Sequence, residues 1–303
     1  MSDNFCWECL VSQHGEVGVA GRRFPGGTTG IPKRPHMAEL HKRLSSHFLF
    51  QIPGVTSYNI CIDPLHVLYV NGVGSHALGS ALHTMCWVAK GRQTVSPEER
   101  IKAIWQRIQT LYKQYNVPSQ LNNLTLAMFV QESKPHASHP MLKCKGAETK
   151  HLLPIVAQIS QETSTSSEED RHRTHLLQSL SRFGDLLDTM PMFPAEAEAH
   201  DAQMAMAAVL EHADWLKQKA VVDGSELWHI VYKHHFAEHL AEACKWMNPR
   251  FGWTFRGEDY VGKVSLLAHS CCFGVRSIDL SGKILEKWRI MLHVKMSRHI
   301  DED

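Results

Sequence analysis

The chain has 303 residues, which is enough for one large domain or two ordinary ones. Its hydrophobic content of 43% is typical of a globular protein. Its formal net charge of +1 supplies no overall positive charge for nucleic acid, so nucleic-acid binding would need a local basic patch. We expect no signal peptide, because the N-terminus has no basic region followed by an apolar core. We expect no transmembrane helix, because no apolar run reaches roughly 18 residues without a polar break. The eight scattered cysteines favour a reducing compartment over a disulfide framework.

The first predicted segment, residues 1–50, contains a C-x-x-C motif at Cys6 and Cys9, followed by the glycine- and proline-rich loop GRRFPGGTTGIPKRP. Two cysteines at this spacing can bind one tetrahedral zinc ion, provided that a second pair of ligands completes the site. Ordinary thiols are the alternative interpretation. Residues 36–47 predict a short amphipathic helix, and the nearby candidate ligands are His14, His36 and His41.

A β-branched and aromatic run at 57–62 predicts a buried strand that ends at Asp63, with His66 three residues later. The apolar segment 67–89 then predicts one largely buried helix. A strand that delivers an acid and a histidine to the start of a helix is a common way to build a polar site. An aspartate that follows a strand and precedes a proline is, however, part of a turn or a helix cap about as often as it is part of a functional site.

The rest of the chain is mostly helical in pattern. Ser96 begins a helix that runs to about 115, with a capping serine, a proline in the first turn and two glutamates near the helix dipole. Residues 123–130 favour a strand, and 160–170 read as an exposed linker. Further helices are predicted at 145–159, 171–190, 195–221, 226–246, from 257 onward and at 281–297, with a short extended piece at 251–255.

Three polar groups could carry chemistry: Asp63 with His66, His235 with His239, and Glu258 with Asp259. Acids combined with histidine can hold Mg²⁺ or Mn²⁺ for phosphoryl chemistry, and two histidines one helical turn apart can hold zinc. Structural roles are the alternative for each group. The chain lacks the H-E-x-x-H, P-loop, G-x-G-x-x-G and G-x-S-x-G motifs, which removes the simplest zinc-peptidase, nucleotide-binding and serine-hydrolase functions.

The order of these motifs, from the C-x-x-C pair through IDPLHVLY, KGAETKHLLPIV, KHHFAEH and MNPRFGW to GEDYVGKVSLL, resembles the C-terminal part of transposase-derived proteins of dinoflagellates. Those proteins are distantly similar to CACTA-like and hAT-like cut-and-paste transposases. The resemblance implies an RNase H-like fold in which three acids bind two Mg²⁺ or Mn²⁺ ions, with a helical insertion before the last acid.

The resemblance assigns a role to each motif residue. It matches Asp63 and His66 to an Asp-x-x-His motif and Glu258 to the final metal-binding acid, with Asp259 as the second choice. It matches the upstream cysteine pair to Cys6 and Cys9, and the histidine-bearing helix to His235 and His239. The first two acids of the family lie upstream of the cysteine pair, where this sequence offers only Asp3. We therefore expect no transposase activity.

The expected fold is mainly α with a few β-strands, a residual and incomplete RNase H-like α/β core interrupted by a large helical insertion. The core spans 51–130, the insertion 131–250, and the C-terminal helices with the final acid 251–303. The expected function is a truncated, transposase-derived, nucleic-acid-associated protein of the nucleus without catalytic activity. DNA and a second copy of the chain are the candidate partners, and no membrane is expected.

Two other functions stay open at this point. One is an interaction module stabilised by Zn²⁺ at Cys6 and Cys9 together with two histidines. The other is a metal-dependent phosphodiester hydrolase that would need five side chains to converge in space: Asp63, His66, His235, His239 and Glu258.

Overall fold

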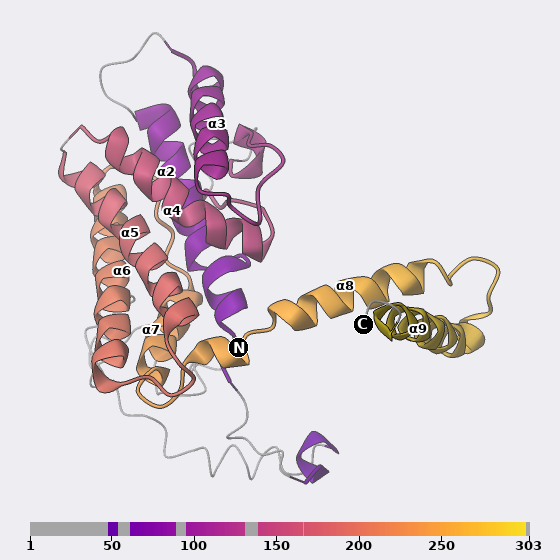
Figure 1. Ribbon diagram of the computed structural model, residues 1–303. Coiled ribbons are helices and arrows are strands. Elements are labelled where there is room, and N and C mark those ends of the chain that lie inside the picture. Colours follow the sequence, from indigo (N-terminus) through magenta and orange to yellow (C-terminus); the bar gives the residue numbers. More distant parts are fainter. Residues whose placement is uncertain (1–47, 54–60, 89–94, 131–138, 166, 301–303) are drawn as a thin grey trace. The chain divides into compact units, whose positions relative to one another are not determined.

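The computed structural model describes residues 48–53, 61–88, 95–130, 139–165 and 167–300, and the side chains of a few residues inside its helices, among them Glu258 and Asp259, lie outside that description (Figure 1). The described residues form a mainly helical chain with eight α-helices and no β-strand. The chain divides into two compact units, Met1–Gly252 and Trp253–Asp303. The mainly helical class that the sequence predicts is confirmed, whereas the predicted strands are absent from the described residues.

Helix α3 (Pro97–Gln114) shows how a local signal determines an element. The backbone N–H of Glu99 donates to the Ser96 hydroxyl over 3.2 Å, and the Glu99 carboxylate accepts from the Ser96 N–H over 3.1 Å. This reciprocal capping satisfies two backbone donors that a helix start otherwise leaves open. The predicted start and end of this helix are confirmed.

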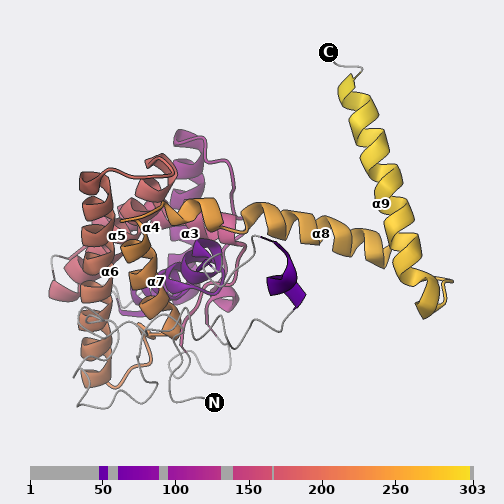
Figure 2. The same ribbon diagram turned by 90° about the horizontal axis from the view of Figure 1, so that it is seen from below.

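The core of the first unit lies among α2 (Val73–His83), α4 (Gly146–Glu162), α5 (Glu168–Thr189) and α6 (Glu196–Val222). Helices α5 and α6 pack along each other, α4 packs on α5, and α2 contacts both α4 and α5 (Figure 2). Gly184 on α5 allows a close approach, since a Cβ there would lie 2.6 Å from the hydroxyl oxygen of the buried Tyr69. The helices predicted at 145–159, 171–190 and 195–221 are confirmed.

The connection between α4 and α5 is shorter than the linker predicted at 160–170. Helix α4 continues to Glu162 and α5 already begins at Glu168. The Asp170 carboxylate accepts from the Thr165 N–H over 2.8 Å and pairs with Arg173 over 2.6 Å. Because Asp170 and Arg173 are both buried, this ion pair holds the short connection against the helices.

The helix predicted at 67–89 is confirmed from residue 73 to 88, but bends at 70–72 separate it from the preceding turn. A π-helical turn at Leu65–Tyr69 precedes α2, and another at Thr84–Val88 follows it. Asn71 lies between the first turn and α2 with φ of 48°, a left-handed conformation that asparagine adopts more readily than most residues. A Cβ on Gly72 would lie 2.3 Å from the Val67 carbonyl oxygen, so the chain doubles back too tightly for a continuous helix.

The predicted strands have different outcomes. Residues 57–60 of the first lie outside the described residues, and Cys61 and Ile62 are not in a strand. The strand predicted at 123–130 is wrong, because Leu126–Met128 forms a 3₁₀ turn. Its carbonyl groups accept from the loop at 141–143 instead, with Met141 N–H to Phe129 O at 3.2 Å. The extended piece predicted at 251–255 is also wrong, since a 3₁₀ turn at Pro249–Gly252 is followed by a helix that begins at Phe255.

Helix α7 (Tyr232–Ala243) begins six positions later than the predicted start at 226. Trp228 has a left-handed φ of 55° and is only 4% exposed, and its backbone N–H donates to the Ser80 hydroxyl of α2 over 3.0 Å. The segment before α7 is therefore held as irregular chain against α2. The Lys233 ammonium donates to the Val70 carbonyl over 2.9 Å and fastens the first turn of α7 to the same region.

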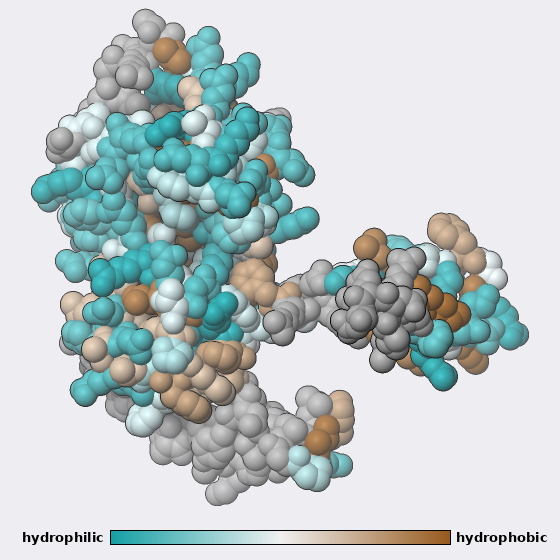
Figure 3. Space-filling view, in the orientation of Figure 1, coloured by the Kyte–Doolittle hydropathy of each residue, from teal (hydrophilic) through white to brown (hydrophobic). Residues whose placement is uncertain are grey.

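The second unit is a pair of helices, α8 (Phe255–His269) and α9 (Ser277–Ile300), which contact each other. Gly274 between them has a left-handed φ of 70°. Several large apolar side chains of this unit are exposed: Val261, Leu266, Phe273, Ile278 and Leu285. Figure 3 shows hydrophobic residues on the visible face of these helices. None of the helices in the described residues combines the length and the apolar character that crossing a membrane requires.

Candidate metal centre

Asp63 and His66 lie together, as the sequence predicts, but they form a local brace. One carboxylate oxygen of Asp63 accepts from the Leu65 N–H over 3.0 Å, and the other lies 2.5 Å from His66 Nδ1. The side chain of Asp63 is 19% exposed and that of His66 is 43% exposed. The acid thus caps the first turn of the π-helical segment while the histidine covers its second oxygen.

His235 and His239 occupy one face of α7, because residues four apart on a helix are neighbours. Their Nε2 atoms lie 3.0 Å apart, and the two residues are 1% and 3% exposed. The rings meet edge to face, with centroids 4.4 Å apart. The pairing that the sequence spacing predicts is therefore present, and it is enclosed by protein.

Glu242 extends this group by one more turn of α7, and sequence reasoning missed it. Its carboxylate oxygen Oε2 lies 3.1 Å from His239 Nδ1. An ionised carboxylate can only accept a hydrogen bond, so the proton of neutral His239 resides on Nδ1 and Nε2 carries the lone pair. The i+3 spacing from His239 was the signal in the sequence that could have identified this residue.

The His235 and His239 pair can do two things. Without a metal ion, one Nε2 donates a hydrogen bond to the other. Alternatively, both can bind one zinc ion, because Zn–N distances of about 2.0–2.1 Å place two nitrogens of a tetrahedral site about 3.3 Å apart. No group of three or more potential ligands among the described residues could hold a metal ion, so these residues offer two ligands at most.

The remaining predicted ligands are not brought to this pair in the part of the chain that the structure describes. Cys6 and Cys9 lie outside the described residues. Glu258 and Asp259 belong to helix α8, and their side chains are not described. Asp63 and Glu258 fall in different compact units of the chain.

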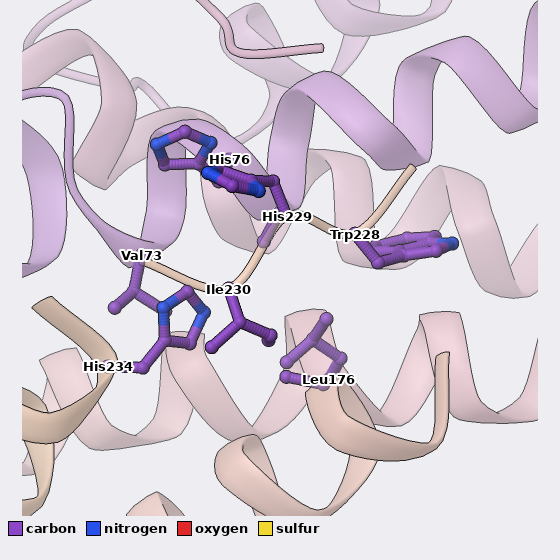
Figure 4. A pocket seen from close by; sticks show the side chains of 9 residues that line it. Val73, His76, Leu176, Trp228, His229, Ile230 and His234 are labelled. Carbon is purple, nitrogen blue, oxygen red and sulfur yellow. The ribbon is translucent and has the colours of Figure 1, made fainter. Parts of the chain in front are cut away.

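A second group of histidines lines a small pocket on the other side of α7, and the sequence analysis did not single it out. Figure 4 shows the rings of His76, His229 and His234 beside Ile230 and Leu176. Burial lowers the pKa of His76 to about 3 and that of His234 to about 4, and neighbouring histidines add to both effects. The rest of the lining is apolar: Val73, Ala77, Ala213 and Trp228.

His139 joins this pocket group from the loop before α4. Its ring stacks on His229 with centroids 3.8 Å apart, and its Nδ1 lies 3.4 Å from a carboxylate oxygen of Glu226. Burial lowers the pKa of His229, with His139 as the next cause. Burial thus favours the neutral forms of His76, His229 and His234, and these rings serve as packing between α2, α7 and the chain before α7.

A third histidine pair joins α5 to α6. The Nδ1 atoms of His172 and His212 lie 3.0 Å apart, and the His172 ring stacks on Trp215 with centroids 4.0 Å apart. Burial is the main cause that lowers the pKa of both histidines, yet both remain partly exposed. This pair matches the α7 pair in nitrogen separation and differs from it in exposure and in the tryptophan stack.

Comparisons of the chain with family models, with curated proteins and with solved structures found no match. The resemblance to transposase-derived proteins stays a prediction.

Proposed function

We propose that this protein is a helical interaction module whose helix α7 is fastened by one zinc ion. His235 and His239 would supply two nitrogen ligands, and Cys6 and Cys9 two thiolates. The observation that carries the proposal is the 3.0 Å approach of the two Nε2 atoms inside the protein. Only a modest opening of this pair would make room for a tetrahedral zinc ion.

The chemistry of the four residues supports zinc over the other common metals. Two imidazoles and two thiolates form a tetrahedral N₂S₂ set, which suits zinc, whereas Mg²⁺ and Mn²⁺ prefer oxygen ligands. The sequence separations, C-x₂-C and H-x₃-H, allow each pair to reach a single ion. A site with four protein ligands leaves no open position for water or substrate, so it is structural and not catalytic.

Exposed aromatic side chains at the end of α7 support the interaction role. Trp246 is 79% exposed and Phe251 is 56% exposed, and Phe193 on the neighbouring α5–α6 connection is 70% exposed. Asn248 joins these segments, since its amide donates to the Leu187 carbonyl over 2.9 Å. Large aromatic residues held on a fixed backbone are typical of protein interfaces.

The test is the zinc content of the purified full chain. We expect one zinc ion per chain, and loss of that ion in Cys6→Ser and in His239→Ala. Cobalt in place of zinc should show the visible absorption of tetrahedral thiolate coordination, and Cys6→Ser should remove it. His212→Ala is the matched control, because it breaks a histidine pair with the same 3.0 Å nitrogen separation and should keep the zinc. A zinc-free wild-type chain, prepared without chelators, would refute the proposal.

The second candidate function is the one implied by the resemblance: a catalytically inert, nucleic-acid-associated remnant of an RNase H-like transposase. The local role of Asp63 supports an inert chain, because its carboxylate caps the turn at Leu65 and pairs with His66. Incubation with DNA and Mg²⁺ or Mn²⁺ should produce no strand cleavage. Cleavage that disappears in Glu258→Ala would instead favour the metal-dependent hydrolase, whose expected residues are Asp63, His66, His235, His239 and Glu258.

A further inference from the structure

We infer that Glu242 is the positioning residue of the zinc centre, which orients His239 for metal binding without contacting the ion. The inference rests on the proposed zinc function. It assigns a specific task to a carboxylate that neither the motif pattern nor the ligand set includes.

The geometry places the three side chains in one row. His235, His239 and Glu242 follow each other along one face of α7, four and then three positions apart. The Glu242 carboxylate meets Nδ1 of His239 at 3.1 Å, and Nε2 on the opposite edge of that ring meets His235 Nε2 at 3.0 Å. The His239 side chain is 2% exposed and that of Glu242 is 28% exposed. The carboxylate therefore reaches inward from the surface to a histidine that water scarcely reaches.

The effect of Glu242 on metal binding follows from the two ring nitrogens of His239, Nδ1 and Nε2. A carboxylate on Nδ1 keeps the proton there, so Nε2 presents its lone pair toward His235 and toward the ion. It also makes the imidazole a stronger ligand, because the hydrogen bond increases electron density on the ring. Histidine ligands in metal sites usually have such a partner, and its loss weakens metal affinity about 10- to 100-fold.

The two histidines consequently differ in what metal binding requires of them. His239 is already in the tautomer that binds through Nε2. With a neutral His239 whose proton faces Glu242, the 3.0 Å contact in the metal-free pair requires His235 to be the donor, which places a proton on His235 Nε2. For both Nε2 atoms to bind one ion, that proton must move to Nδ1 of His235. Glu242 thus determines which histidine is preset for the metal and which must rearrange.

A purely stabilising ion pair is the competing explanation, since Glu242 and His239 are neighbours on one helix. Competition with a chromogenic zinc chelator at pH 7.5 separates the two. We expect Glu242→Ala to bind zinc about 10- to 100-fold more weakly than wild type, with the stoichiometry kept at one. Glu242→Gln retains an oxygen acceptor of the same shape, so its affinity should fall between wild type and Glu242→Ala.

The matched control is Glu226→Ala, which removes a carboxylate from another histidine, His139, at 3.4 Å and should leave zinc affinity unchanged. Unaltered affinity in both Glu242 variants would overturn the inference while the proposed zinc function stands. So would an equal loss of thermal stability by Glu242→Gln with and without zinc, because a helix ion pair acts in both states. A wild-type chain that binds no zinc would refute the proposed function itself.

Discussion

Helix α7 presents histidines on two faces, and the surroundings of the imidazole rings differ between them. One face is lined by apolar side chains and other histidines, and the other brings a carboxylate to a histidine pair. His234 faces the pocket with His76 and His229, among apolar side chains, where burial lowers its pKa to about 4. The neighbouring residue, His235, faces His239, which is braced by the Glu242 carboxylate. The adjacent positions diverge because successive residues on a helix point about 100° apart.

The difference shows that burial alone does not make a histidine a ligand. In the pocket, His76 and His234 are surrounded by apolar side chains and other histidines, so desolvation favours their neutral forms and they act as packing. On the other face, a carboxylate fixes the tautomer and two nitrogens converge. Whether a buried histidine is suited to bind a metal therefore depends on the group that contacts its other ring nitrogen.

The largest expected effect is the loss of folding stability when a large side chain is removed from the pocket beside His234. Trp228 is 4% exposed, and its removal by Trp228→Ala should lower the free energy of unfolding by about 3–5 kcal/mol, because a large buried side chain leaves a cavity. Urea unfolding measures the loss, and zinc content should remain at one ion per chain. Trp246→Ala is the control, since this tryptophan is 79% exposed and should change stability by no more than about 0.5 kcal/mol. Loss of zinc in Trp228→Ala would show that the two faces are not independent.

Removal of zinc from the proposed His235 and His239 site should have the next largest effect on folding stability. With free zinc at a hundred times its Kd, bound zinc stabilises the folded chain by about 2.7 kcal/mol, and a chelator should remove that amount. Thermal unfolding with and without chelator measures the difference. His239→Ala should show no response to the chelator, because it has no site to lose. An equal response of wild type and His239→Ala would contradict the assignment of the site to α7.

The smallest of the three effects is the loss of folding stability at low pH that comes from the buried His234 in the pocket. His234 stays neutral in the fold while its unfolded counterpart, with a pKa of 6.5, takes up a proton, so stability is present above pH 6.5 and falls as the pH drops toward about 4. At pH 5 this single group should cost about 2 kcal/mol of unfolding free energy. Urea unfolding at pH 7 and pH 5 tests the prediction.

His234→Gln should lose less stability between pH 7 and pH 5 than wild type, by about that same 2 kcal/mol, because an amide does not titrate in this range. His200→Gln, at an exposed position on α6, should keep the wild-type pH dependence. Identical pH dependence in wild type and His234→Gln would mean that His76, His229 and other groups carry the acid sensitivity.

Local signals predicted the helices well and the site in part. Ser96 and Glu99 identify the start of α3 because capping involves only neighbouring residues. The i, i+4 spacing of His235 and His239 predicts a shared face, since helix geometry alone sets it. The 123–130 strand failed because Leu126–Met128 forms a 3₁₀ turn, and the carbonyl groups of Met128 and Phe129 accept from the 141–143 loop.

By itself, the sequence determined that this is a mainly helical protein, that helices occupy the α3, α5 and α6 segments, and that two histidines share a face of α7. These properties depend on periodicity and caps, which act over a few residues. Only the tertiary structure decided where α7 begins, because the Ser80 hydroxyl and a buried left-handed Trp228 hold the preceding chain out of the helix. It also decided which histidines are packing and which meet a carboxylate, because desolvation depends on the residues that surround a ring and not on its neighbours in sequence.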